Sequence, residues 1–170
     1  MSQISSVQTE QHLFPVNSTF AAHANIRSEE QYQSMVERAN SDYEGYWGDL
    51  AQQYIDWHTP FTTVLNQENA PFYKWFQEGK LNVSYNCLDR HLLTHPHKTA
   101  IIFESDAGHV ETVTYKELHH KVCRFANGLK TLGVIKGDRV VIYMPNSIEA
   151  IIAMQACARI GAIHSVVFGG

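Results

Sequence analysis

Residues 140–170 read VVIYMPNSIEAIIAMQACARIGAIHSVVFGG, and this stretch decides the fold. The run Val140–Tyr143 is apolar and uncharged, which is typical of a β-strand covered on both faces. Asn146 and Glu149 have the spacing of a helix N-terminus, and apolar residues then recur at helical intervals. Gly161 is placed to end this helix in the left-handed conformation, and a second apolar run follows it. The sequence therefore predicts a right-handed strand–helix–strand unit with parallel strands.

The end of the second strand is the expected ligand edge. Open α/β sheets bind ligands at the carboxyl ends of parallel strands. Here Gly169 and Gly170 follow the strand, and their bare backbone lets a phosphate or an adenine come close, although two glycines also suit a plain turn. A strand covered on both faces needs neighbouring strands. We therefore expect the chain to be the front part of a longer protein.

A hairpin and a long helix are predicted before this unit. Thr99–Glu104 and Val110–Thr114 have the pattern of paired antiparallel strands around a turn. Thr114 and Glu117 form a capping box, and the helix that they begin has an apolar stripe that ends near Gly133. The expected fold class is thus α/β, with a helical and looped N-terminal layer followed by a β-hairpin and a truncated βαβ unit.

The N-terminal part is expected to be mainly helical. Residues 1–25 are polar and aperiodic and are predicted to form a mobile arm. Helices are expected after Ser28 and Asp42, and another is expected from Asn82 to Pro96. Residues 62–80 are predicted to be an aromatic connector, the alternative being a ligand cradle. We divide the remaining chain into a helical region, 26–97, and the start of a larger domain, 98–170.

Composition narrows the classes of partner. The chain has 170 residues, of which 44% are hydrophobic and 18% charged, with a formal net charge of −4. No basic stripe points to nucleic acid, and no apolar run reaches the roughly 20 residues that span a bilayer. No secretory signal pattern precedes the domain. We therefore predict a cytoplasmic protein that binds neither nucleic acid nor membrane.

Cysteine and histidine raise one alternative, a zinc site. Cys87, His91 and His95 recur every four residues on the predicted helix, and thiolate and imidazole are good zinc ligands. Three ligands stacked along one helix do not converge on a point, so we predict no metal site and no catalytic residue in the chain. Asp89 is expected on a solvated face, the alternative being an ion pair with a partner domain, and His119 is expected at the surface.

Several blocks of the sequence resemble the AMP-forming acetyl-CoA synthetases, a family of acetate–CoA ligases within the adenylate-forming enzymes. The resemblance covers roughly residues 29–170, because several long blocks occur in the same order. These blocks are Leu81–His91, Thr114–Leu118, Gly137–Val140, Ile142–Pro145 and Ala156–Gly170, preceded by Trp47, Asp56–Trp57 and Pro60–Phe61.

The resemblance implies a two-step reaction for the full-length parent. Acetate and ATP give acetyl-adenylate and pyrophosphate with the help of Mg²⁺, and CoA then displaces AMP. It places Phe168, Gly169 and Gly170 at the CoA nucleotide site. The phosphate loop, the adenine- and ribose-binding motifs, the acetate pocket and the C-terminal lysine that activates the carboxylate all lie beyond residue 170 in the family. We therefore expect the 170 residues alone to bind none of these ligands tightly and to be inactive.

Two further interpretations stay open. The parent could act on propionate or another short acid, because the acyl pocket lies outside this sequence. Alternatively, the chain could be a complete, non-catalytic interaction module, although its last strand would then expose an apolar face and an unpaired edge.

Overall fold

The computed structural model describes residues 14–167, and the chain divides into two compact units, residues 1–46 and 47–170. The first unit holds the helices α1 (Ser18–His23) and α2 (Glu29–Ser41). Asn17 and Ser28 cap these helices by accepting hydrogen bonds from the backbone N–H groups of Phe20 and Gln31. The helix start at Ser28 is confirmed. Helix α1 was not anticipated, and it lies inside the segment that was expected to be an arm.

Helix α3 (Tyr43–Tyr54) runs from the first unit into the second and begins where expected, since Asp42 accepts a hydrogen bond from the Gly45 N–H. Beyond it, the predicted connector proves to contain a β-hairpin. Strands β1 (Thr63–Asn66) and β2 (Lys74–Gln77) pair antiparallel. Four-residue strands in an irregular sequence carry too little alternation to be recognised.

The aromatic residues beside this hairpin pack on one another. The ring centroids of Trp57, Phe61 and Phe76 lie 5.1 to 5.7 Å apart. The indole N–H of Trp57 donates to the Ala51 carbonyl at 2.9 Å, which ties the cluster to α3. The rings therefore form a small core of their own.

The prediction of one helix from Asn82 to Pro96 is wrong, because the helix is much shorter. Asn82 does cap α4, but α4 covers only Val83–Cys87. Leu88 has φ −124° and ψ −65°, and the chain continues as the 3₁₀ turn η1 (Asp89–His91). Leu88 is 3% exposed, and its place in the core accounts for the break in the helix.

The hairpin and the helix that follow are confirmed. Strands β3 (Thr99–Glu104) and β4 (Val110–Thr114) pair antiparallel. Thr114 and Glu117 form both hydrogen bonds of the capping box that begins α5 (Tyr115–Thr131).

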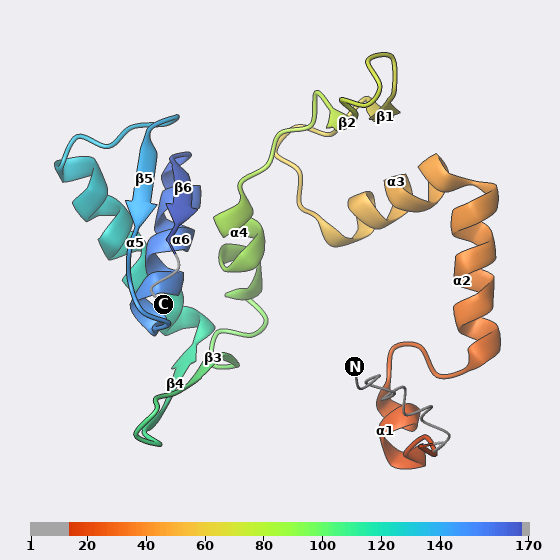
Figure 1. The fold of residues 1–170 in the computed structure, drawn as a ribbon, viewed down its shortest axis with the longest axis horizontal. Coiled ribbons are helices and arrows are strands. Elements are labelled where there is room, and N and C mark those ends of the chain that lie inside the picture. The colour runs from red at the N-terminus through yellow and green to blue at the C-terminus, as the bar shows by residue number, and fades with distance from the viewer. Residues whose placement is uncertain (1–13, 168–170) are drawn as a thin grey trace, which may run out of the picture. The chain divides into compact units, whose positions relative to one another are not determined.

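The strand–helix–strand unit is also confirmed. Strands β5 (Arg139–Ile142) and β6 (Ile163–Val166) are parallel and are joined by α6 (Ile148–Ile160). Figure 1 shows α6 against the two strands. Gly161 adopts the expected left-handed conformation, with φ 76°. The expected cap is one residue off, because Ser147, not Asn146, accepts from the Ala150 N–H.

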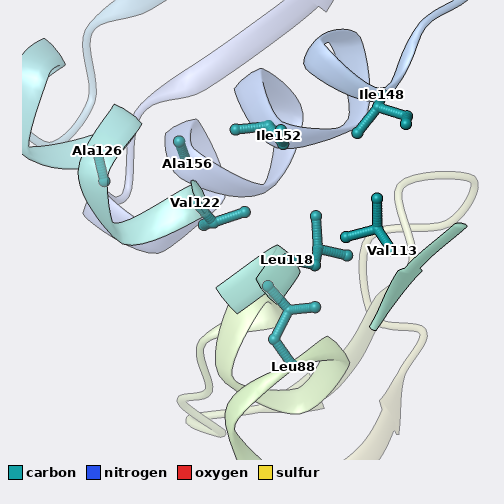
Figure 2. Close-up of a cluster of buried hydrophobic side chains, with 8 residues drawn as sticks. All are labelled: Leu88, Val113, Leu118, Val122, Ala126, Ile148, Ile152 and Ala156. Carbon is teal, nitrogen blue, oxygen red and sulfur yellow. The ribbon is translucent and has the colours of Figure 1, made fainter. Parts of the chain in front are cut away.

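The core of the second unit lies where α5 and α6 meet β4 and Leu88. Figure 2 shows the side chain of Leu88 gathered with buried side chains of β4, α5 and α6. The buried cluster consists of Leu88, Val113, Leu118, Val122, Ala126, Ile148, Ile152 and Ala156. Small residues on α6 let it pack closely on α5.

Only one face of the β5–β6 pair is covered within residues 14–167. All four residues of β6 are exposed, and so are Val141 and Tyr143. The second covering layer that the apolar pattern predicts is therefore not among the described residues. No helix among the described residues is long and apolar enough to cross a membrane.

The core predicts the effect of a single truncation. Val122 is 0% exposed, whereas Leu132, just after the same helix, is 82% exposed. We expect Val122→Ala to lower the free energy of unfolding by about 2 kcal/mol, because two methyl groups and their contacts are lost. Leu132→Ala is the control and should change it by less than about 0.5 kcal/mol. Urea unfolding curves measure both, and equal effects would contradict this core.

Candidate functional site

The candidate ligand edge is the carboxyl end of β5 and β6. The strands pair in parallel from Arg139–Ile163 to Ile142–Val166, and the Val167 N–H extends the pairing by donating to the Ile142 carbonyl at 2.9 Å. Both strands therefore reach the same edge of the sheet. The predicted CoA-binding residues, Phe168, Gly169 and Gly170, lie outside the described residues. The structure thus fixes the strand that leads into them.

A groove of about 960 Å³ opens at this edge. Its walls come from β3 and the turn after it, from the segment between β5 and α6, from α6 itself and from the end of β6. Met144, Met154 and Val167 line it together with further apolar side chains, while Ser147 and Asp106 contribute polar groups. A mainly apolar groove of this size can hold part of a small-molecule ligand.

The histidines and cysteine considered for zinc do not come together. Cys87 is exposed at the end of α4, and the break at Leu88 removes the common helix face. The ring of His91 lies 5.4 Å from that of Tyr115, and His95 Nδ1 lies 2.7 Å from the Thr94 hydroxyl. In the described part of the chain, no group of three or more His, Cys, Asp or Glu side chains could hold a metal ion.

The structure instead reveals a polar cluster that sequence reasoning missed. The Arg159 guanidinium donates two hydrogen bonds to the Asp89 carboxylate, each 2.7 Å long. His119 Nε2 lies 3.2 Å from Asp89 Oδ1 and 3.3 Å from Arg159 Nη2. The predictions of a solvated Asp89 and a surface His119 are therefore wrong. Together with Arg159, these two residues join η1, α5 and α6.

Asp89 and Arg159 each stabilise the charged form of the other. The hydrogen bonds from Arg159 hold the pKa of Asp89 below its usual value, although burial acts in the opposite direction. The same hydrogen bonds raise the pKa of Arg159. The side chains of Arg159 and Asp89 are only 26% and 20% exposed, so water screens the pair less than it screens a surface ion pair.

A second contact holds the same end of α6. The side-chain amide of Asn82 donates to the carbonyls of Ala158 and Arg159, at 3.4 and 3.1 Å. These carbonyls belong to the last turn of the helix, where backbone acceptors lack partners within the helix. Asn82 and Asp89 therefore fix the position from which the chain turns into β6. Both residues and Arg159 lie in sequence blocks that carry the family resemblance, and that was the only signal for their contact.

Two family models match consecutive parts of the chain. Residues 32–87 match the model described as acetyl-coenzyme A synthetase N-terminus, and residues 88–170 match the AMP-binding enzyme model. Over all 170 residues the chain is 65% identical to an acetyl-coenzyme A synthetase of Thiobacillus denitrificans and 62% identical to one of Nitrosomonas europaea.

The chain belongs to the acetyl-coenzyme A synthetase family. It spans 26% of the length of each of these two family members. Among solved structures it is similar to an acetoacetyl-CoA synthetase from Streptomyces lividans, with a TM-score of 0.75 and 26% sequence identity. This similarity covers 89% of the chain and 24% of that protein, which supports the mixed α/β fold.

The Asp89–Arg159 pair of this family member predicts a loss of stability with acid. Asp89→Asn leaves a half-buried guanidinium without its counter-charge, so we expect it to lower the free energy of unfolding at pH 7 by about 2 kcal/mol. Asp106→Asn, in the exposed turn between β3 and β4, is the control.

The pH dependence distinguishes the charge from packing. The pKa of Asp89 is lower in the folded chain than its ordinary value of 3.8. The contribution of the pair is therefore present above that value and is lost as the pH falls through the folded pKa. The difference between the unchanged chain and Asp89→Asn should shrink below about pH 4. A difference in unfolding free energy that stays constant down to pH 2 would rule out this electrostatic origin.

Proposed function

We propose that this chain forms the opening part of an AMP-forming acetate–CoA ligase. The observation that carries the proposal is the 65% identity to an acetyl-coenzyme A synthetase over the whole chain. Identity to the acetoacetyl-CoA synthetase is only 26%, which favours acetate over the larger acid. Because the chain spans about a quarter of its relatives, its activity depends on sequence that these 170 residues do not include.

The proposed reaction solves a chemical problem of the acetate ion. A carboxylate is a poor electrophile, because the oxygen that must leave is a poor leaving group. An acetate oxygen attacks the α-phosphate of ATP, pyrophosphate leaves, and acetyl-adenylate forms. The thiol of CoA then attacks the acyl carbon, AMP leaves, and the thiol proton passes to a base. Mg²⁺ would assist the first step, but no metal-binding group occurs among residues 14–167, so none of those residues is given that role.

The role that we assign to this chain is to bind the CoA nucleotide through Phe168, Gly169 and Gly170. In the sequence these residues follow Val167, and the described strand before them, β6, ends at the carboxyl edge of a parallel pair, where α/β sheets bind ligands. Glycine lets the backbone approach an adenine or a pyrophosphate more closely than any other residue would. ATP and acetate would bind to the remainder of the enzyme.

The division of the chain follows from the same proposal. Residues 26–97 form a helical layer, and residues 98–170 begin the AMP-binding domain. Leu88 and Asp89 already contribute to the core and the ion pair of the second part, so the layer and the domain share this junction.

The proposal predicts activity only in the context of a whole enzyme. We expect the purified chain to show no acetate-dependent exchange of pyrophosphate into ATP. A chimera in which it replaces the aligned residues of the Thiobacillus denitrificans relative should show this exchange at a rate within about tenfold of the parent, because ~60% identical segments conserve the fold. An inactive but folded chimera, or exchange by the chain alone, would refute the proposal.

The CoA site predicts a selective defect in the chimera. Gly169→Val adds a branched side chain where the backbone should meet the nucleotide. We expect the KM for CoA in acetyl-CoA formation to rise about tenfold or more, the equivalent of at least ~1.4 kcal/mol of lost binding. Pyrophosphate exchange, which does not need CoA, serves as the internal control and should stay unchanged. A loss of both activities together would point to misfolding, and no change in either would remove Gly169 from the site.

A further inference from the structure

One thiol of the chain touches the polar cluster. Cys123 lies on α5 one turn after His119, and its Sγ is 3.5 Å from His119 Nε2. The Cys123 side chain is half-buried, so a small reagent can reach it. A thiol in contact with an imidazole is the arrangement that activates cysteine nucleophiles, since the ring can accept the thiol proton.

Two charged groups face His119 Nε2. When this nitrogen carries no proton, its lone pair can accept from Arg159 Nη2 at 3.3 Å but also faces the Asp89 carboxylate oxygen at 3.2 Å, which is a repulsive contact. A proton transferred from Cys123 turns Nε2 into a donor to this oxygen. Arg159 keeps Asp89 in place with its two 2.7 Å hydrogen bonds. The arrangement is no catalytic triad, because the thiol and the carboxylate meet the same ring nitrogen.

Arg159 supplies the positive charge that a thiolate needs. The pKa of Arg159 is raised first by its hydrogen bonds to Asp89 and, to a smaller extent, by Cys123. The charged and titratable groups facing Cys123 thus come from η1, α5 and α6: Asp89, His119 and Arg159. Asp89 is already neutralised by Arg159, so its repulsion of a thiolate is reduced.

The other two thiols lack these features. Cys87 is exposed, and no hydrogen bond or ion pair of its thiol is found among residues 14–167. Cys157 is 0% exposed, and burial raises the pKa of its thiol. The chain therefore contains an accessible reference thiol and an inaccessible one beside Cys123.

We propose that Cys123 is a modification site, a nucleophilic thiol that reacts with hydroperoxides and soft carbon electrophiles. With a hydroperoxide, the thiolate sulfur attacks the distal oxygen. An S–O bond forms and the O–O bond breaks. The sulfur is oxidised by two electrons to a sulfenic acid, and the alkoxide that leaves, or hydroxide in the case of hydrogen peroxide, takes up the proton held by His119 and departs as an alcohol or as water. The added oxygen occupies space between α5 and α6, so the modification weakens the contacts around Arg159.

Alkylation rates test this site without any enzyme assay. The purified chain is treated with excess iodoacetamide at pH 7, and labelling at each cysteine is followed by peptide mass spectrometry. Cys123 should react about fivefold or more faster than the more exposed Cys87, because His119 can accept the thiol proton as the sulfur attacks. Cys157 should stay unlabelled. Hydrogen peroxide followed by dimedone should label Cys123 first.

Two variants isolate the imidazole. His119→Gln should slow the labelling of Cys123 about fivefold and leave Cys87 unchanged. His120→Gln changes the neighbouring exposed histidine and should have no effect. Labelling of Cys157 would reveal that a variant is unfolded. In that case the proposal is tested on the unchanged chain, by the ratio of the Cys123 to the Cys87 labelling rate between pH 6 and 9. A ratio at or below one, or equal rates in folded His119→Gln, would overturn the proposal.

Discussion

The ion pair between Asp89 and Arg159 is the constraint on which much of the second unit depends. It joins residues 70 positions apart and brings η1 against the last turn of α6. Asn82 reaches the same turn through its side-chain amide. The Asn82 contact joins the segment that matches the N-terminal family model to the AMP-binding part, whereas Asp89 and Arg159 both lie within the AMP-binding part. Removing one partner of the pair would destabilise the fold, because the other charge would stay half-buried without a counter-charge.

Local chemistry could be predicted from the sequence, and long-range pairing could not. Thr114 and Glu117 are three residues apart and satisfy each other's backbone, so their capping box was visible in the sequence. Gly161 likewise marks the helix end by its own conformation. The partners of Asp89 and His119 lie on other elements, and charge and hydrophobic periodicity carry no information about them. The error at Leu88 has the same origin, because a core contact overrides the propensity of the surrounding helix.

The candidate site was predicted only through the family resemblance. The apolar pattern of the sequence predicts that β5 and β6 are parallel and that α6 connects them with a right-handed crossover. Parallel strands bind ligands at their carboxyl ends, so this topology predicts the ligand edge. Patterning alone could not choose between a turn and a nucleotide site at Gly169 and Gly170, and these two residues lie outside the described part. The resemblance and the strand direction agree on the same edge. The groove beside Met144 and Val167 was not predicted, because its walls come from segments that are far apart in the sequence.

The exposed face of β5 and β6 has a consequence for the behaviour of the chain in isolation. Among residues 14–167, β6 pairs only with β5, so its other edge keeps backbone donors and acceptors unused. Val141, Tyr143 and Ile163 add an apolar surface next to that edge. Such an edge is a template for any extended segment, including another copy of the same strand. The isolated chain is therefore subject to self-association that depends on its concentration, and its apparent stability will include that association.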